Sequence, residues 1–286
     1  MKTLRKLKVA GLSVKQLIEA PLYNIFDAEH IPLLHYCIRN WGDAINPFLV
    51  NLMSGKNIRS VDIDAYKASQ KIFPSMESDI YMAIGSILHH ADSRVIVWGS
   101  GLISQNVLPV EPPKYITAVR GPKTARALRN AGIECPDVFG DPVLLLPKYI
   151  KNNASKKYKL GVVLHNTDER AILPDEILGI DDVIMISLRG GILDTLEKIL
   201  ACDAIVSSSL HGLIVADAYG IPSGRIYTSD TRTGDFKFED YYESIGQPNP
   251  KKYKLEKDTT LRDILSLCKP REVALDLNKL ADAAPF

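Results

Sequence analysis

The sequence of 286 residues predicts an α/β fold made of two Rossmann-like lobes with parallel sheets that face each other across a cleft. Short apolar runs alternate with helical patterns, which is typical of parallel sheets covered by helices. This alternation occurs in two separate series. A polar, lysine-rich stretch, KYIKNNASKKYK (148–159), stands between them as an interdomain linker would. We therefore expect a first lobe over residues 1–150 and a second lobe over residues 151–286.

The first series contains five apolar runs that indicate strands. They cover residues 31–37, 57–63, 79–85, 94–99 and 114–121. A helix is expected over 44–55, because Gly55 provides a stop signal, and another over 122–132, which opens with Pro122. The segment DVFGDPVLLLP (137–147) closes this lobe.

The second series repeats the order of strand and helix. Strands are expected over residues 160–166, 182–188, 204–209 and 223–228. Helices are expected over residues 191–203, 211–220 and 259–269. Polar residues follow several of these strands, and ligands of open parallel sheets bind beyond the carboxyl ends of strands.

Composition and charge exclude several classes of protein. The net charge is +1, which gives no support for nucleic-acid binding. No run approaches the ~20 apolar residues of a transmembrane helix. The N-terminus, MKTLRKLKVAGLSVKQLIEA, is a poor signal peptide because Lys8 and Lys15 interrupt its apolar residues. This basic start could touch an anionic membrane surface or form a solvated arm.

The cysteine and histidine patterns predict neither disulfides nor a metal site. The four cysteines are widely separated and form no CxxC pair, so we expect buried, reduced side chains in a reducing compartment. His89 and His90 are adjacent, and neighbouring residues on a helix point about 100° apart. No carboxylate at ligand spacing accompanies these two histidines, and we expect them to be solvated.

The stretch CDAIVSSSLHGLIVADAYGIP (202–222) places serines and a histidine where a predicted strand meets a predicted helix. We expect Ser208 or Ser209 to cap this helix through its hydroxyl group. Capping does not explain His211, because the helix dipole disfavours positive charge in the first turn. The same helix end attracts anions. The junction is therefore predicted to bind a phosphate or carboxylate beside the titratable His211.

Five segments resemble the polysaccharide pyruvyl transferases and occur along the chain in the order found in that family. The stretch VSSSLHGLIVADAYGIP resembles their signature, and FKFEDYYESIG (236–246) resembles the segment that follows it in the succinoglycan-type branch. The other three are NWGD (40–43), AVRGPKTARALRNAGI (118–133) and VFGDPVLLLP (138–147). The resemblance extends over roughly residues 30–250.

The resemblance implies the two-lobed fold of the GT-B glycosyltransferases and a transfer of pyruvate from phosphoenolpyruvate to two hydroxyls of a sugar, which forms a ketal. It implies as acceptor a lipid-linked oligosaccharide of an exopolysaccharide or cell-surface glycan, and a cytoplasmic location with peripheral contact at the inner face of the plasma membrane. No cofactor or metal is expected, since protonation activates the phosphoenolpyruvate co-substrate. The chain also has no GxxxxGK[ST] or GxGxxG pattern.

The resemblance also suggests roles for particular residues. His211 is expected to act as the acid–base group and to protonate the methylene carbon once donor anions favour its charged form. Arg120, at a strand end, is expected to hold the donor anions. Asp43 is a second catalytic candidate, although a turn closed by an Asp43 helix cap would explain it equally well.

The remaining candidates are residues expected to bind substrate. Gly99 and the other glycines at strand ends allow close approach to a ligand, or simply form turns. Asp141 is expected to be structural. The substrate-binding candidates are Asn40, Gly99, Ser100, His165, Ser208, Ser209, Leu210 and Gly212.

One position departs from the family pattern. Many members have an arginine two residues before the histidine, where this chain has Ser209. Arg189, Arg225 and Lys237 are local candidates for the missing charge. Two alternatives stay open: a glycosyltransferase that uses a nucleotide sugar, because fold does not fix function, and a non-catalytic member that has lost donor binding.

Overall fold

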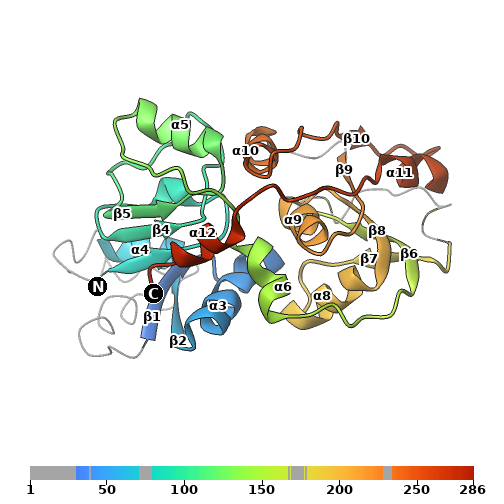
Figure 1. Ribbon diagram of the computed structural model, residues 1–286, viewed down its shortest axis with the longest axis horizontal. Coiled ribbons are helices and arrows are strands. Elements are labelled where there is room, and N and C mark those ends of the chain that lie inside the picture. The colour runs from blue at the N-terminus through green and yellow to red at the C-terminus, as the bar shows by residue number, and fades with distance from the viewer. Residues whose placement is uncertain are drawn as a thin grey trace, which may run out of the picture.

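The computed structural model describes residues 30–38, 40–70, 79–166, 168, 177, 179–227 and 234–286. It contains two five-stranded parallel sheets flanked by helices, which lie side by side as two lobes (Figure 1). This confirms the predicted α/β class and the two Rossmann-like lobes. The basic N-terminal segment lies outside the described residues.

The first sheet has the strand order β2-β1-β3-β4-β5. Its strands are β1 (His30–His35), β2 (Asn57–Asp62), β3 (Ile80–Met82), β4 (Val95–Trp98) and β5 (Tyr115–Ala118). Each of the five lies within, or one residue outside, a run predicted to be a strand. Helix α3 (Trp41–Ser54) follows β1 and helix α5 (Pro122–Asn130) follows β5. Helix α4 (Ile63–Gln70) was not predicted.

The second sheet has the order β10-β9-β8-β6-β7. Its strands are β6 (Tyr158–Val163), β7 (Val183–Ile186), β8 (Cys202–Ser207), β9 (Ser223–Tyr227) and β10 (Tyr253–Lys254). Helices α8 (Ile192–Leu200) and α9 (Leu210–Ala218) connect strands of this sheet, and α10 (Phe236–Ser244) and α11 (Leu261–Leu267) come after β9 and β10. Because β6 begins at Tyr158, the sheet takes up the last residues of the stretch expected to be a linker.

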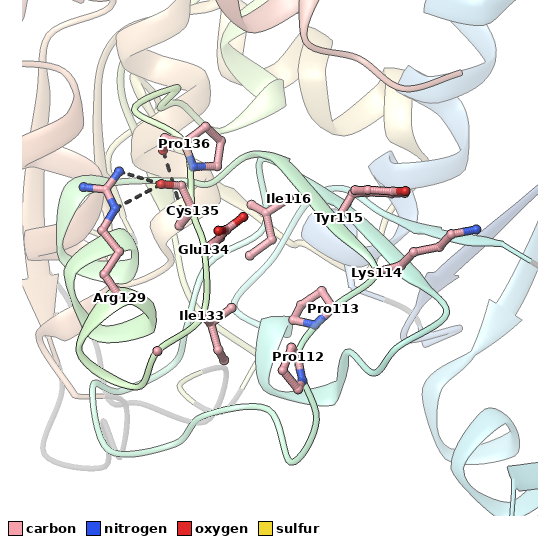
Figure 2. Close-up of a pocket in the computed structure, with 11 residues that line it drawn as sticks. Pro112, Pro113, Lys114, Tyr115, Ile116, Arg129, Ile133, Glu134, Cys135 and Pro136 are labelled. Atoms are coloured by element: carbon pink, nitrogen blue, oxygen red, sulfur yellow. Dashed lines mark hydrogen bonds between the residues drawn. The ribbon is translucent and has the colours of Figure 1, made fainter.

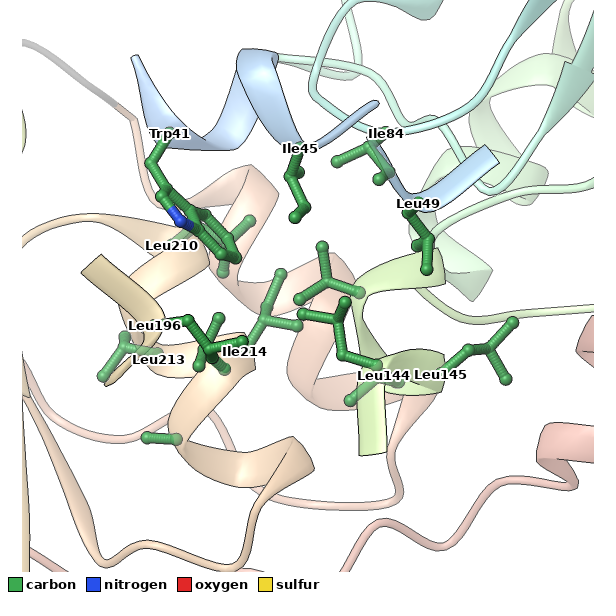
Figure 3. Packing of buried hydrophobic residues seen from close by; sticks show 14 of the residues in the cluster. Trp41, Ile45, Leu49, Ile84, Leu144, Leu145, Leu196, Leu210, Leu213 and Ile214 are labelled. Carbon is green, nitrogen blue, oxygen red and sulfur yellow. The ribbon is translucent and has the colours of Figure 1, made fainter. Parts of the chain in front are cut away.

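A hydrophobic cluster joins the two lobes (Figure 3). Trp41, Ile45 and Leu49 of α3 contribute from the first lobe, and all three are almost completely buried. Leu210 and Leu213 of α9 contribute from the second. The 3₁₀ helix η4 (Pro142–Leu145), followed by α6 (Leu146–Tyr149), brings further leucines into the same cluster. The N-terminal ends of α3 and α9 are thereby held close together where the lobes meet.

The last part of the chain returns to the first lobe. Helix α12 (Leu277–Asp282) lies across that lobe in Figure 1. The indole Nε1 of Trp98 donates to the carbonyl of Leu280 at 2.9 Å, and Leu280 is fully buried. The ring of Phe286 stands edge-on to Trp98 and Tyr81. Residues about 180 positions apart thus complete one core.

The cysteines and histidines differ in part from the prediction. Cys202 is buried and Cys135 and Cys268 are partly buried, but Cys37 is exposed, so the expectation of four buried thiols is wrong for Cys37. His89 and His90 are also half-buried, not solvated. They lie in the short 3₁₀ helix η3 (Leu88–His90), where the Tyr36 hydroxyl and His90 Nε2 lie 2.9 Å apart. None of the described helices is long and apolar enough to cross a membrane.

Candidate active site

The serines between β8 and α9 close a turn and do not cap the helix. Ser207 Oγ accepts from the amide of Ser209 at 3.0 Å and lies 2.8 Å from the carbonyl of Val163. Ser208 Oγ accepts from the amide of His165 at 2.9 Å. Ser209 occupies the N-cap position of α9 without a side-chain cap bond, so the predicted serine cap is wrong. Ser207 Oγ thus accepts from the amide of Ser209, and Ser208 Oγ accepts from the amide of His165 just beyond β6, so neither hydroxyl caps α9.

His211 lies in the first turn of α9 and packs against the first turn of α3. A Cβ atom at Gly42 would lie only 2.2 Å from His211 Nδ1 and 2.6 Å from Cε1. The glycine of the NWGD motif therefore leaves the space that the ring of His211 occupies. Two motifs far apart in the sequence meet here, one from each lobe.

The other ring nitrogen of His211 faces Asp141. His211 Nε2 and Asp141 Oδ2 lie 4.0 Å apart, too far for a hydrogen bond. Both atoms are buried, and neither has a hydrogen-bond partner in the described structure. Asp141 Oδ1 accepts from the amide of Val143 at 3.1 Å and caps η4. One carboxylate oxygen thus fixes the loop, and the other points at the histidine.

Burial and charge set the protonation of this pair. Burial, followed by the charges of Lys237, Arg120 and His165, lowers the pKa of His211 to about 3. Burial raises the pKa of Asp141 to about 6, although the amide of Val143 and the charge of Arg120 oppose the shift. At neutral pH the free site therefore holds a neutral imidazole beside a carboxylate.

Arg120 lies at the carboxyl end of β5, as expected, and is engaged by protein groups. Its Nε and Nη2 lie 3.0 and 2.9 Å from Asp240 Oδ2, a residue of α10 in the second lobe. Nη1 donates to Ser86 Oγ and Nη2 to the carbonyl of Leu102. Both members of the ion pair are almost completely buried. At most one N–H group of the guanidinium, on Nη1, is left for a ligand.

Helix α10 also places Lys237 at this junction. Lys237 is 7% exposed. Its charge is the largest electrostatic influence on both His211 and His165. The positive groups of the site therefore come from both lobes.

Asn40 and Asp43 lie at the start of α3. Asn40 caps the helix, because its Oδ1 accepts from the amide of Gly42 at 3.4 Å, and its Nδ2 donates to Asp43 Oδ2 at 2.7 Å. The N-cap of α3 is therefore Asn40, and the suggested Asp43 cap is wrong. Burial raises the pKa of Asp43 to about 6. Its charge acts on Tyr36 and Cys37 beyond β1, and it is not among the groups that shift the pKa of His211.

Four residues expected to bind substrate lie in packed positions. The side chain of Leu210 is in the interlobe cluster, and a Cβ at Gly212 would be 2.4 Å from Ser207 Oγ. Gly99 has a φ of +85° and packs against Pro142, while Ser100 Oγ donates to the carbonyl of Gly85 at 2.9 Å. These residues shape the backbone around the site, and their expected contact with a ligand stays a prediction.

A pocket of about 810 Å³ lies away from these residues (Figure 2). It is lined by Tyr115 and Ile116 at the start of β5, together with Arg129 and Cys135. Arg120 follows the other end of the same strand, so this pocket is separate from the site. Among the described residues, no group of three or more His, Cys, Asp or Glu side chains is placed to hold a metal ion.

Comparison with known proteins identifies the family. The family model for polysaccharide pyruvyl transferase matches residues 40–230, which include His211, Asp141, Arg120 and the NWGD motif. The chain belongs to the polysaccharide pyruvyl transferase family. This confirms the resemblance described above and assigns the chain to transferases that act on polysaccharides.

Two relatives match most of the length of this chain. "Succinoglycan biosynthesis protein ExoV" of Rhizobium meliloti (strain 1021) is 31% identical over 216 residues, which cover 72% of this chain and 62% of ExoV. "Uncharacterized protein L143" of Acanthamoeba polyphaga mimivirus is 27% identical over 224 residues, 74% of each chain. The match to ExoV supports the succinoglycan-type branch. No solved structure matched this chain.

Sequence reasoning missed or undervalued three features of this site. Asp141 was expected to be structural, but one of its oxygens faces His211. Gly42 received no role, although it is the glycine of the NWGD motif. Lys237 was one of three candidate cations, and only the packing of α10 distinguishes it from Arg225, which pairs with Asp235.

Proposed function

We propose that this protein transfers pyruvate from phosphoenolpyruvate to two hydroxyls of a sugar in an exopolysaccharide or other cell-surface glycan, forming a pyruvate ketal. Family membership and the similarity to ExoV support a polysaccharide acceptor. The observation that carries the proposal is the His211–Asp141 pair, whose facing atoms are buried and unbonded at 4.0 Å, beside Arg120 and Lys237. It offers a proton-transfer group next to positive charge, which a reaction of an anionic enol requires.

The proposed reaction balances without an added oxidant or reductant. Two sugar O–H bonds break, as do the π bond between C2 and the methylene carbon of the donor and the bond between C2 and the phosphate oxygen. Two C–O bonds form at C2, and one C–H bond forms at the methylene carbon, which becomes a methyl group. One hydroxyl proton ends on that methyl group, and the other leaves with phosphate.

His211 is the proposed proton carrier. Its neutral ring in the free site accepts a proton from a sugar hydroxyl. When the anionic donor binds, its charge offsets the cations that lower the pKa of His211. The pKa of His211 then rises, so the ring can hold a proton. The histidinium then delivers its proton to the methylene carbon. The neutral ring next accepts the proton of the second hydroxyl, and this proton leaves with phosphate.

Asp141 is the proposed orienting group for His211. A movement of roughly 1 Å would bring Oδ2 within hydrogen-bond distance of Nε2. The carboxylate would then hold a proton on Nε2 and direct Nδ1 to the side of Gly42. A carboxylate that orients a histidine also stabilises its charged form after proton transfer.

The donor anions have a natural binding place at the N-terminus of α9. No side chain caps that helix, so its first-turn amides point outward without a cap. Arg120 adds positive charge, although Asp240 offsets most of it. No metal or organic cofactor is proposed, because protonation of the enol carbon activates the donor. Asp43 and Asn40 remain proposed contacts on the first-lobe side, where the pKa of Asp43 is raised to about 6 by burial.

The acceptor and location are proposed from the same family relationship. We propose a lipid-linked oligosaccharide that is modified at the inner face of the plasma membrane by a cytoplasmic enzyme. The basic sequence at the N-terminus, with Lys2, Arg5, Lys6 and Lys8, suits contact with anionic lipid. That segment lies outside the described residues.

The test of the proposed function is a binding and turnover experiment. Isothermal titration with phosphoenolpyruvate, beside UDP- and GDP-sugars, identifies the donor. We expect phosphoenolpyruvate to bind, and we expect acceptor-dependent phosphate release that His211→Ala abolishes while its melting temperature is retained. Binding of a nucleotide sugar in place of phosphoenolpyruvate would assign the chain to the glycosyltransferases, and unchanged turnover in His211→Ala would remove His211 from the mechanism.

A further inference from the structure

Lys237 stands in the first turn of α10, on the face that meets the first lobe. It precedes Asp240 by three residues, so the two side chains lie on the same side of the helix. Asp240 reaches across to Arg120 and also accepts from the amide and hydroxyl of Thr124, at 2.8 and 2.7 Å. A Cβ at Gly121 would lie 2.0 Å from the carbonyl oxygen of Asp240, which shows how closely α10 docks. This docking buries Lys237 between the lobes.

The two arginines around Lys237 have carboxylate partners. Arg120 pairs with Asp240, and Arg225 pairs with Asp235. The guanidinium of Arg225 also stacks over Phe238, 3.6 Å from the ring centroid, and Lys237 Nζ lies 5.3 Å from the same centroid. Within the described part of the chain, Lys237 has no carboxylate within ion-pair distance. It is therefore the cation of this group whose charge has no direct partner.

The surroundings of Lys237 make its charge costly in the free protein. Burial, followed by the charges of Arg120 and Arg225, lowers the pKa of Lys237 to about 8, and Asp168 opposes this shift. Charged or titratable groups that act on Lys237, or on which it acts, come from several elements. They are Arg120, His165, Asp168, His211 and Arg225. A buried cation among other cations stabilises a protein only when an anion accompanies it.

We propose that Lys237 binds an oxyanion of the donor, phosphate or carboxylate, together with the uncapped first-turn amides of α9. Phosphate and carboxylate are both ligands that a buried ammonium recognises as a point charge. The second sign of a ligand here is Lys237 itself, a side chain only 7% exposed whose charge has no direct partner among the described residues. An anion between these groups would offset the positive charges that surround it.

This assignment explains how the site binds an anion with a serine at position 209. The side chain of Ser209 is uncharged and only 3% exposed, so it supplies no positive charge. Lys237 supplies that charge from α10, 28 residues after Ser209 in the chain. The identity of the donor rests on the proposed function, whereas the anion site itself rests on the contacts of Lys237.

The test compares Lys237→Met with Lys252→Met. Lys252 also lies in the second lobe, but it is exposed and pairs with Asp235 at 3.1 Å. Isothermal titration of both variants and of the unmodified protein uses phosphoenolpyruvate, inorganic phosphate and pyruvate as probes. We expect Lys237→Met to weaken phosphoenolpyruvate binding by about 10- to 100-fold and Lys252→Met to leave it unchanged. We also expect Lys237→Met to melt no lower than the unmodified protein without ligand, because it removes a buried charge.

The probes separate this inference from the proposed function. Phosphate or pyruvate binding that depends on Lys237 identifies which oxyanion it holds and supports the inference, even if phosphoenolpyruvate does not bind and the proposed function fails. Equal phosphoenolpyruvate affinity in Lys237→Met and the unmodified protein overturns the inference and leaves the proposed function standing. No binding of any of the three probes to the unmodified protein overturns the anion site.

The pH dependence supplies a readout that a structural role would not change. Anion affinity in the unmodified protein should fall as the pH rises above about 8, because the free site then loses the charge of Lys237. Lys237→Arg, which keeps its charge at this pH, should lose that dependence. An identical decline in Lys237→Arg would show that another group titrates and would overturn the assignment.

Discussion

Gly42→Ala tests the contact between the two motifs that meet at the site. Gly42 lies in the first turn of α3 with helical backbone, so alanine should favour the helix by up to about 1 kcal/mol. The new Cβ would, however, lie 2.2 Å from His211 Nδ1, where ordinary contacts begin at 3.4 Å. The ring must therefore move by about 1 Å. A displacement of this size at a reacting group costs roughly 10²-fold in rate.

The assay is acceptor-dependent phosphate release from phosphoenolpyruvate at saturating concentrations, measured beside the melting temperature. We expect kcat to fall by about 10²-fold while the melting temperature changes by no more than about 2–4 °C. Gly191→Ala is the matched control, since its Cβ would meet nothing closer than 3.9 Å at the start of α8. Full activity in Gly42→Ala would refute the reasoning, because the ring position of His211 would then not matter.

Three further substitutions probe the pair and the lobe contacts. Asp141→Asn should lower kcat by about 10²–10⁴-fold, yet raise stability above pH 6 by up to about 3 kcal/mol. Burial raises the pKa of Asp141 to about 6, so the folded protein binds the carboxyl proton more tightly than the unfolded chain does. The folded protein therefore loses stability as the pH rises from about 4 to 6. A denaturation series in the unmodified protein without that pH dependence would contradict the buried position of Asp141. Asp240→Asn should lower the free energy of unfolding by about 3–5 kcal/mol, because it leaves Arg120 buried and unpaired. A loss below about 1 kcal/mol in urea unfolding would show that the Arg120–Asp240 pair is solvated. Leu280→Ala should lower the free energy of unfolding by about 2–5 kcal/mol. Leu193→Ala, at an exposed position, should leave the unfolding midpoint unchanged. Equal midpoints for the two variants would contradict the docking of α12.

The local patterns predicted the sheets well because strands and their glycine stops depend on neighbouring residues. The cap of α9 was predicted wrongly for a physical reason. Three consecutive serines offer three hydroxyls, and their spacing does not determine which one faces the turn. In the structure Ser207 closes the turn, and Ser208 Oγ accepts from the amide of His165, two residues beyond the end of β6. Such a choice depends on the adjacent strand, which local sequence does not reveal.

The parts of the site that were missed depend on partners far away in the sequence. Asp141 does cap η4, as a structural residue would, and only the packing of α9 brings its second oxygen to His211. Asp240 and Arg120 are 120 residues apart. Helix α10 buries both polar and aromatic side chains because it lies between lobes, so it lacks the clean apolar stripe of a surface helix.

The return of α12 to the first lobe has a consequence for synthesis of the protein. The first sheet is complete in sequence by residue 118, but the indole of Trp98 finds its acceptor only when residue 280 is available. During translation the first lobe therefore emerges with an unfilled edge, while the second lobe is still being made. Its core closes only after residue 280 has been synthesised, so apolar surface of the first lobe stays exposed until then.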